Sequence, residues 1–382
     1  MPPQKPLSIA LVGVGGVGTA FLSQLALLQS HLRAKNKTDI RLVLIRRSNA
    51  QILDSSWRGL DIKTAVKQLE DKSNGEGKGK LLGFEETCVH LATAPGHVVL
   101  VDCTSDPLIA EGYPGVLKKG ISIITPNKKA FSSSFSDWQQ IFETAANGPN
   151  AGEREKGHGF IFHESTVGAG LPVLSTLTEL IETGDEVTRI EGVFSGTMSF
   201  LFNSFNPVAG GGGSFSAEVS KAKELGYTEP DPRDDLNGLD VARKLTILAR
   251  LTGLPIESPT AFPVQSLIPK ELETCSSADE FMARLPEFDS RMDDLKSSAN
   301  ATGKVIRFVG SIDVGKREVK VGLEEFEKSH PIAALKGSDN IINFYTKRYG
   351  SNPLIIQGAG AGAEVTAMGV MGDLLRVIRL LK

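Results

Sequence analysis

Cysteine is scarce in this sequence of 382 residues, which contains only Cys88, Cys103 and Cys275. The number is odd, and the three residues lack the spacing of a CxxC motif or of a cysteine–histidine metal site. Neither a disulfide framework nor a structural zinc site is expected, and free thiols favour a reducing, cytoplasmic location. No apolar run approaches the ~18 residues of a membrane span. The first strand-like segment also begins too near the N-terminus to leave room for a signal peptide, so no membrane partner is expected.

An excess of either charge is also missing. The 42 lysines and arginines nearly balance the 45 acidic residues, which leaves a net charge of −3 and a pI near 6.1. This balance argues against nucleic acid or an anionic membrane surface as a partner. An apolar fraction of 40% is typical of globular proteins, and 382 residues are enough for two domains with separate cores.

Glycine, with 40 residues, is by contrast abundant and concentrated in a few motifs. The first motif lies between an apolar, strand-like segment at 7–12 and a segment with helical spacing of apolar residues at 19–32. A GxGxxG pattern in that position predicts a dinucleotide-binding turn, because glycine lets the backbone approach the pyrophosphate and the helix N-terminus faces the phosphates. A glycine turn without a ligand is the alternative. The residues expected to contact the cofactor are Gly13, Gly15, Gly16, Val17 and Gly18.

Strands and helices alternate through the rest of the N-terminal part. Buried strands are predicted at 40–45, 98–101 and 121–124. This alternation, which continues to residue 145, is typical of a Rossmann fold, an α/β architecture with a doubly wound parallel sheet. The polar stretch 63–80 interrupts it and is predicted to be a surface insertion with no assigned role.

The pattern changes after a turn-rich segment at 147–158. We predict a dinucleotide-binding domain at 1–158, a second, α+β domain at 159–345, and a C-terminal segment at 346–382 whose helix returns to the nucleotide-binding domain. In the second domain, a mixed sheet is expected from three strand-like segments, 187–193, 305–309 and 319–323.

The end of the second predicted strand carries Arg46, Arg47 and Ser48. An NAD-specific site usually has an acidic residue there, which binds the ribose 2′-hydroxyl. A guanidinium can pair with a 2′-phosphate, which a carboxylate would repel. The sequence therefore favours NADPH as the cofactor, with NADH also acceptable. Two solvated arginines at a strand end are the alternative.

The most informative stretch, 226–244, reads GYTEPDPRDDLNGLDVARK. Two prolines give it an extended, acidic first half, and a helix is predicted at 234–251. Asp240 and Lys244 are four residues apart, so they share a face of this helix with Asn237, one turn earlier. Taken alone, such a pair is most simply explained as an exposed ion pair on a helix.

Taken with the rest of the chain, this stretch resembles the substrate site of the homoserine dehydrogenase family, and most of all its fungal, monofunctional members. Five further motifs occur in the order found in that family. They are DCTS at Asp102–Ser105, TPNK at Thr125–Lys128, HESTVGAG at His163–Gly170, SGT at Ser195–Thr197 and GAGAG at Gly358–Gly362. The similarity spans almost the whole chain, and 63–80 is the main part without a match.

The resemblance implies the NAD(P)H-dependent, reversible reduction of L-aspartate 4-semialdehyde to L-homoserine, a step of threonine and methionine biosynthesis. A hydride passes to the aldehyde carbon, and the forming alkoxide needs a proton, which a lysine ammonium can supply. By similarity, Lys244 is the expected proton donor. Lys128 is expected to orient the substrate and the nicotinamide, and Lys129 would take its place if the alignment shifted by one residue.

Other contacts of the site follow from the same resemblance. Glu229 and Asp240 are expected to bind the ammonium or hydroxyl group of the substrate, with Asp235 as a further partner. Contacts to the cofactor are expected from Thr104, Ser105, Lys128, Ser195, Gly196, Thr197 and Gly362. A Thr104 that merely caps a turn is the alternative.

A monovalent cation, expected to be Na+, is also implied by the resemblance. Its ligands would be the Glu164 carboxylate and the backbone carbonyls of Val167, Ala169 and Leu171. Oxygen ligands suit a hard cation, which would position this loop; a plain glycine-rich turn is the alternative. The second domain is expected to bind the substrate and to pair with its copy in a homodimer.

Two other functions explain less of the sequence. An aspartate-semialdehyde dehydrogenase needs a thiolate nucleophile backed by a histidine, and Cys103, at a strand end, has no convincing histidine partner. His163 and His330 are both predicted to be structural. A nucleotide sensor without turnover would have no use for a proton donor such as Lys244.

Overall fold

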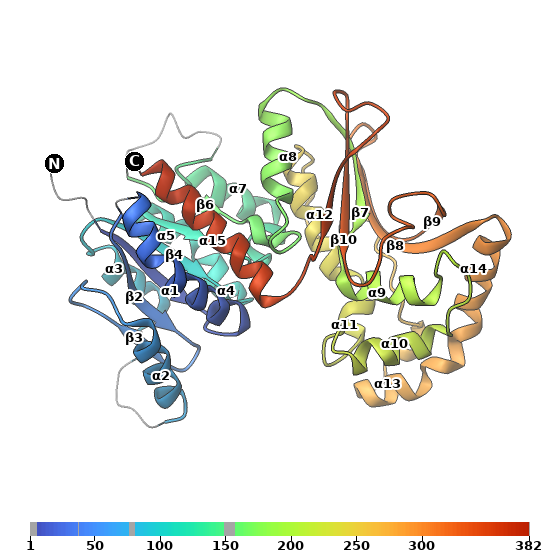
Figure 1. The fold of residues 1–382 in the computed structure, drawn as a ribbon, viewed down its shortest axis with the longest axis horizontal. Helices are drawn as coiled ribbons and strands as arrows, with labels where there is room; N and C mark the ends of the chain where they lie inside the picture. Colours follow the sequence, from blue (N-terminus) through green and yellow to red (C-terminus); the bar gives the residue numbers. More distant parts are fainter. Residues whose placement is uncertain (1–5, 37, 76–80, 149–156, 382) are drawn as a thin grey trace. The chain divides into compact units, whose positions relative to one another are not determined.

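The computed structural model describes residues 6–36, 38–75, 81–148 and 157–381. The chain divides into two compact units, one formed by Met1–Gly170 with Gly362–Lys382 and the other by Leu171–Ala361 (Figure 1). The boundaries predicted at 158 and 345 are therefore both too early. The reason is visible in the sheets, because the segment before Gly170 extends the first sheet and a strand after residue 345 completes the second.

The first unit contains a Rossmann-type sheet, as the sequence predicts. Among the described residues, its six strands are β1 (Leu7–Val12), β2 (Ile40–Arg46), β3 (Gln51–Leu53), β4 (His97–Asp102), β5 (Ile121–Ile124) and β6 (Ile161–Phe162), in the spatial order β3-β2-β1-β4-β5-β6. All neighbours are parallel except β3, which pairs antiparallel with β2 as a short edge hairpin. The chain crosses over after β3, which brings the carboxyl ends of β1 and β4 side by side.

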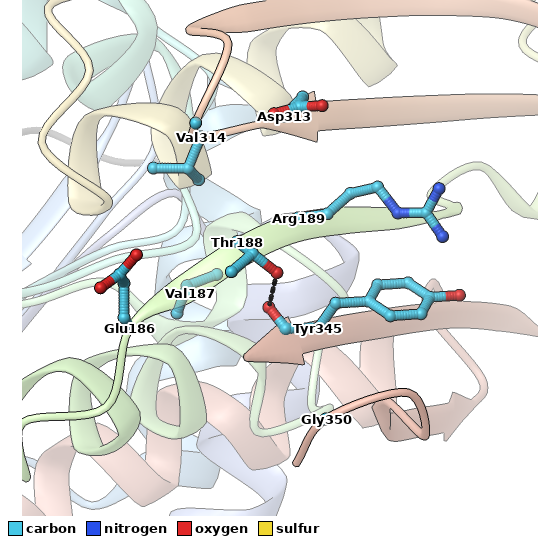
Figure 2. Close-up of a pocket in the computed structure, with 9 residues that line it drawn as sticks. Glu186, Val187, Thr188, Arg189, Asp313, Val314, Tyr345 and Gly350 are labelled. Atoms are coloured by element: carbon cyan, nitrogen blue, oxygen red, sulfur yellow. Dashed lines mark hydrogen bonds between the residues drawn. The ribbon is translucent and has the colours of Figure 1, made fainter. Parts of the chain in front are cut away.

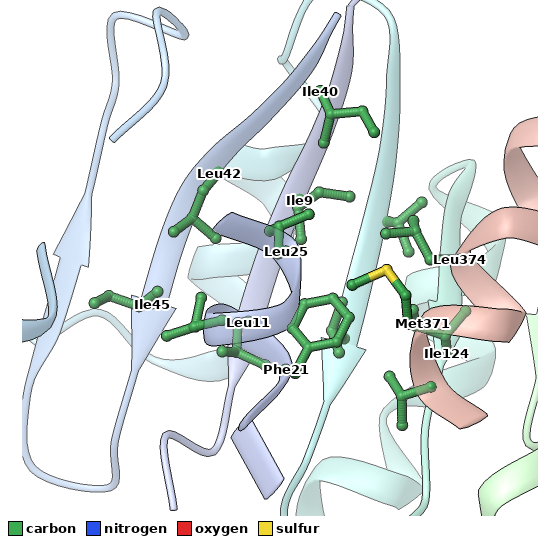
Figure 3. Close-up of a cluster of buried hydrophobic side chains, with 14 of the residues drawn as sticks. Ile9, Leu11, Phe21, Leu25, Ile40, Leu42, Ile45, Ile124, Met371 and Leu374 are labelled. Atoms are coloured by element: carbon green, nitrogen blue, oxygen red, sulfur yellow. The ribbon is translucent and has the colours of Figure 1, made fainter. Parts of the chain in front are cut away.

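Apolar side chains fill the space between this sheet and two helices that are far apart in the sequence. Ile9 and Leu11 of β1 are completely buried, and Phe21 of α1 (Gly16–Asn36) packs with them (Figure 3). Met371 and Leu374 belong to α15 (Ala363–Leu380), which joins the same cluster (Figure 3). Full burial of such a side chain contributes about 1.5–3 kcal/mol, so the C-terminal helix is an integral part of the nucleotide-binding unit.

The remaining helices of the first unit are mostly short. They are α2 (Ile62–Ser73), α3 (Phe84–Leu91), α4 (Pro107–Glu111), α5 (Tyr113–Lys118), α6 (Lys129–Ser132), α7 (Phe135–Thr144) and the 3-10 turn η2 (Glu164–Thr166). Most of the segment predicted to be a surface insertion is thus the regular helix α2. Its polar composition hid two buried residues, Ala65 and Leu69, that are four apart on one helix face. Residues 76–80 of that prediction lie outside the described residues.

The second unit is an antiparallel sheet with helices rather than the mixed sheet that we expected. Its strands are β7 (Val187–Val193), β8 (Lys304–Asp313), β9 (Glu318–Glu327), β10 (Asn340–Thr346) and β11 (Leu354–Gly358), in the order β11-β10-β7-β8-β9. Every pairing between these strands is antiparallel. Hairpins join β8 to β9 and β10 to β11, so long parallel crossovers are not needed there.

Helices of the second unit carry most of the predicted substrate site. They are α8 (Val173–Glu182), α9 (Gly196–Phe205), α10 (Phe215–Glu224), α11 (Arg233–Leu236), α12 (Leu239–Leu251), α13 (Ala278–Arg284) and α14 (Asp289–Ala301), with 3-10 turns η3 (Lys270–Leu272) and η4 (Leu285–Phe288). No helix in the described part of the chain is long and apolar enough to cross a membrane.

Candidate functional site

The glycine turn of the first unit has the geometry of a dinucleotide-binding site. Gly13 has a φ of +92°, and a Cβ there would lie 2.7 Å from the backbone carbonyl carbon of Cys103. A Cβ on Gly18 would overlap the Gly13 carbonyl oxygen. Gly15, in contrast, has no heavy atom within 4 Å of its Cβ direction. The turn is therefore tight at both ends and open in the middle, where a phosphate can approach the backbone.

A second helix begins beside this turn. Gly362, with a φ of +108°, is the N-cap of α15, and the next residue, Ala363, lies 3.7 Å from a Cβ built on Gly16. The side-chain amide of Gln24 on α1 donates to the Glu364 carbonyl at 3.0 Å. The amino ends of α1 and α15 thus lie side by side, so Gly362 adjoins the predicted phosphate site.

The two arginines at the end of β2 have different surroundings. Arg46 is half-buried, and its Nη1 donates to the Leu82 carbonyl at 2.7 Å and to Thr87 Oγ1 at 3.1 Å. Burial lowers the pKa of Arg46. Arg47 lies against the glycine turn, where its Nε donates to the Val14 carbonyl at 3.1 Å. Arg46 therefore holds α3 onto the sheet, while Arg47 lies against the predicted pyrophosphate turn.

Two further loops at the carboxyl edge of the sheet carry predicted residues. Thr104, after β4, contacts the glycine turn: its Cγ2 would lie 2.8 Å from a Cβ on Gly13. Its hydroxyl accepts from the Asp106 amide at 3.2 Å, so it also caps a turn. The next residue, Ser105, is exposed. Lys128 follows β5, is half-buried and forms the N-cap of α6.

The loop predicted to bind a cation is braced by two residues that the sequence did not reveal. Arg376 Nη1 lies 2.9 Å from Glu164 Oε2 and 3.1 Å from Asp373 Oδ1. Asp373 Oδ2 in turn accepts from the Glu164 amide at 3.0 Å. Burial raises the pKa of Asp373 to about 7. The Glu164 carboxylate thus pairs with a guanidinium from α15.

Backbone oxygens remain the other proposed ligands of that loop. Val167 is fully buried, and Ala169 has a φ of +54°. Leu171, the first residue of the second unit, accepts from the Val173 amide through its carbonyl at 2.8 Å. Within the described residues, no group of three or more histidine, cysteine and acidic side chains is arranged to hold a metal ion.

Lys244 of α12 is one of the buried charged residues of the second unit. Only 7% of the residue is exposed, and its Nζ lies 2.7 Å from Asp240 Oδ2. The same ammonium donates to the Phe194 carbonyl at 2.6 Å. Exposed ion pairs on helices contribute little, whereas a buried ammonium is costly unless it is paired. The pairing at i and i+4 is confirmed, and because the Lys244 side chain is buried, the pair differs from the fully exposed surface pair that is the simplest alternative.

The helix that carries this pair begins later than we predicted. Gly238 has a φ of +75°, which separates α11 from α12. Asn237 therefore lies in the break, where its Oδ1 accepts from the Leu239 amide at 2.8 Å. The positive φ favours glycine here, and a Cβ on Gly238 would also lie a tight 3.1 Å from the Val264 side chain. The prediction that Asn237 shares the helix face of Asp240 and Lys244 is wrong.

Asp235 joins the predicted substrate loop to α9. Its Oδ2 accepts from the Glu229 amide at 2.8 Å, and its Oδ1 lies 2.8 Å from the Thr197 hydroxyl. Burial raises the pKa of Asp235. Ser195 caps α9 by accepting from the Met198 amide at 3.3 Å, and Gly196 is the first residue of that helix. Glu229 itself is exposed. Asp235 is thus placed to fix both segments.

An open groove of about 600 Å³ lies elsewhere on the second unit, at the end of its sheet (Figure 2). Arg189 and Tyr345 line it, with the guanidinium 4.1 Å from the ring centroid. The Thr188 hydroxyl donates to the Tyr345 carbonyl at 3.1 Å (Figure 2). None of the residues predicted to bind substrate or cofactor lines this groove.

A glycine turn between β1 and α1 on a Rossmann sheet indicates a dinucleotide-binding protein. The second unit adds a buried lysine paired with a partly exposed aspartate, which fits a nicotinamide-dependent oxidoreductase. Comparison with known proteins agrees. Residues 13–150 match the family described as "Homoserine dehydrogenase, NAD binding domain", and residues 172–375 match the family described as "Homoserine dehydrogenase".

Individual proteins are also similar to this chain. A homoserine dehydrogenase of Emericella nidulans is 56% identical over 387 aligned positions, which cover 98% of this chain and 99% of the relative. A crystal structure of a Candida auris protein of unknown function is 41% identical, with a TM-score of 0.89 over 99% of both chains. A hyperthermophilic archaeal homoserine dehydrogenase in complex with NADPH shares the fold, with 23% identity and a TM-score of 0.68 over 98% of both chains. The chain belongs to the homoserine dehydrogenase family.

Proposed function

We propose that this chain catalyses the NADPH-dependent, reversible reduction of L-aspartate 4-semialdehyde to L-homoserine, with Lys244 as the proton donor. The observation that carries the proposal is the burial of Lys244 between the Asp240 carboxylate at 2.7 Å and the Phe194 carbonyl at 2.6 Å. When bound, the nicotinamide supplies the hydride. Lys244 holds a proton for the alkoxide oxygen, and its charge stabilises the developing negative charge more strongly in a desolvated site than in water.

The other residues of the site would bind and orient. Glu229, which is exposed and fixed through its backbone by Asp235, would bind the substrate ammonium. Asp240 would bind the substrate in addition to pairing with Lys244, since 44% of its side chain is exposed. Lys128 would orient the aldehyde and the nicotinamide from the carboxyl edge of the first sheet.

NADPH is the cofactor that we propose, in preference to NADH. Arg47 is the proposed partner of the 2′-phosphate, because Arg46 is held by the Leu82 carbonyl and Thr87. Exposed Ser48 could add a hydroxyl donor. The remaining contacts to the cofactor would come from the glycine turn and from Thr104, Ser105, Ser195, Gly196, Thr197 and Gly362.

Three further properties complete the proposal. A monovalent cation, Na+ by resemblance, would be held mainly by the carbonyls of Val167, Ala169 and Leu171, because the Glu164 carboxylate is paired with Arg376. Two copies of the chain would pair through their second units as a homodimer. The free thiols of the chain fit a cytoplasmic location.

A rival assignment as an aspartate-semialdehyde dehydrogenase loses support. Burial, with Asp102 nearby, raises the pKa of the Cys103 thiol well above its usual range, so a thiolate nucleophile is disfavoured. His163 stacks on Phe131 with ring centroids 3.9 Å apart, and burial lowers its pKa to about 3. The prediction that His163 is a structural residue fits this packing.

Initial-rate measurements test the proposal. NADPH oxidation would be followed with L-aspartate 4-semialdehyde, and the product would be identified as L-homoserine by chromatography. Homoserine formed in amounts equal to the NADPH consumed is the expected result. NADPH binding without consumption of this aldehyde would refute the proposed substrate, and faster turnover with NADH would refute the proposed cofactor preference.

A further inference from the structure

A carboxylate that the proposed mechanism does not use lies at the end of β4. Asp102 is fully buried. Its Oδ1 accepts from the Thr104 amide at 2.8 Å, and its Oδ2 accepts from the Tyr113 hydroxyl at 2.6 Å and from the Asn127 side-chain amide at 3.2 Å. A buried carboxylate is costly unless hydrogen bonds replace its water. Here three donors do so, each from a different segment of the first unit.

Thr125 joins Asp102, Tyr113 and Asn127 in a group that connects the loops after β4 and β5. Thr125, at the end of β5, donates through its hydroxyl to the Asp102 carbonyl at 2.8 Å and accepts from the Asn127 amide at 2.9 Å. The Asn127 side chain also donates to the Asp106 carbonyl at 3.1 Å. Asp102, Tyr113 and Thr125 are 0% exposed and Asn127 is 2% exposed. These four buried residues form the loop-linking network.

The loop-linking network touches two loops that carry proposed active-site residues of the first unit, those after β4 and β5. Thr104, whose amide binds Asp102, contacts the glycine turn. Lys128 directly follows Asn127, and its carbonyl accepts from the amides of Phe131 and Ser132 at 3.1 and 3.0 Å. The backbone of Lys128 is thus fixed on both sides, on one side by the network and on the other by α6.

We infer that the loop-linking network positions Lys128 and Thr104 for the reaction, and that Tyr113 is a positioning residue acting through Lys128. This inference rests on the proposed function, in which Lys128 orients the aldehyde. The parallel pairing of β4 with β5 fixes these strands without the Tyr113 hydroxyl. The hydroxyl therefore mainly fixes the positions of the loops that follow the two strands. Burial raises the pKa of Tyr113 well above its usual value, which keeps the hydroxyl protonated as a donor to Asp102.

Tyr113→Phe tests the inference, because it keeps the ring, which packs 6.3 Å from Phe131, and removes only the donor. A small misplacement of an orienting group can cost up to about 10² in rate, and we expect kcat to fall about tenfold with NADPH and aspartate semialdehyde. Thr125→Val is the second variant, in case Tyr113→Phe does not fold. Its control is Thr144→Val, because Thr144 is also buried but donates only within its own helix, to Gln140 at 2.7 Å.

A purely structural role would lower the melting temperature of Thr125→Val and Thr144→Val alike and leave kcat unchanged in both; that result would overturn the inference. The decisive measurement is the double variant Tyr113→Phe/Lys128→Ala. If Tyr113 acts through Lys128, the double variant is no slower than Lys128→Ala alone. If Lys128→Ala is slow by itself and the double variant loses rate by the product of the two single losses, Tyr113 does not act through Lys128. That result would overturn the inference about the network but leave the proposed function intact. A wild-type rate in Lys128→Ala would instead refute the proposed role of Lys128, and the inference with it.

Discussion

Lys244→Met separates proton donation from packing, since methionine is a long apolar side chain that can fill the buried position. Loss of a positioned general acid lowers kcat by roughly 10²–10⁴, which corresponds to about 2.7–5.4 kcal/mol of transition-state stabilisation. The effect on folding should be smaller. Removal of the ammonium leaves the Phe194 carbonyl without its donor at 2.6 Å, and an unsatisfied buried acceptor costs about 1–3 kcal/mol. Asp240, with 44% of its side chain exposed, can be solvated instead.

The assay compares three quantities in wild type and variant: kcat for NADPH oxidation, the dissociation constant of NADPH from fluorescence, and the melting temperature. We expect kcat to collapse while NADPH still binds and the melting temperature falls by a few degrees. Lys221→Met is the matched control, because Lys221 also pairs with a carboxylate on a helix of the second unit, at 3.8 Å from Glu218, but its side chain is 56% exposed. A folded Lys244→Met that binds NADPH and keeps more than about a tenth of wild-type kcat would refute Lys244 as the proton donor.

Three other predictions test separate parts of the molecule. Arg47→Ala should weaken NADPH binding about tenfold or more, since a charge-assisted hydrogen bond contributes about 1.5–3 kcal/mol, and it should leave NADH binding unchanged. Arg46→Ala should instead lower the melting temperature. If Arg46→Ala weakened NADPH binding and Arg47→Ala lowered the melting temperature, the roles of the two arginines would be exchanged. Gly18→Ala should abolish NADPH binding in titrations, because its Cβ would overlap backbone, whereas Gly83→Ala, with nothing within 4 Å, should bind normally. His163 has a folded pKa of about 3 against 6.5 unfolded, so the unfolded state binds the extra proton and its contribution to stability is lost as pH falls from about 6.5 towards 3. His163→Gln should therefore show a shallower loss of unfolding free energy over that range in denaturant titrations, and an unchanged slope would contradict the assignment.

Local rules were sufficient for several features. The requirement for glycine at positions 13 and 18 follows from a strand–turn–helix of fixed length, and the structure supplies the close approaches that explain it. The pairing of Asp240 with Lys244 follows from a helical repeat of 3.6 residues. The break at Gly238 did not follow from the spacing of apolar residues, because it depends on the left-handed backbone of one glycine, with a φ of +75°.

Pairs of residues far apart in the chain were beyond the reach of spacing arguments. Arg376 pairs with Glu164 across 212 positions, and Asn127 binds Asp102 across 25. The two neighbouring arginines at the end of β2 look equivalent in the sequence. Their partners in the structure distinguish them: Leu82 and Thr87 for Arg46, and the Val14 carbonyl for Arg47.

The sequence by itself determined the fold class, the dinucleotide turn and the helix that carries the lysine, because each depends on residues within a few positions of one another. Tertiary structure alone decided that Lys244 is buried against the Phe194 carbonyl, 50 positions away. It also decided that β11 completes the second sheet and that Asp102 links two loops. The physical reason is that periodicity and turn chemistry act along the chain, whereas burial and hydrogen-bond partners are set by which segments pack together in space.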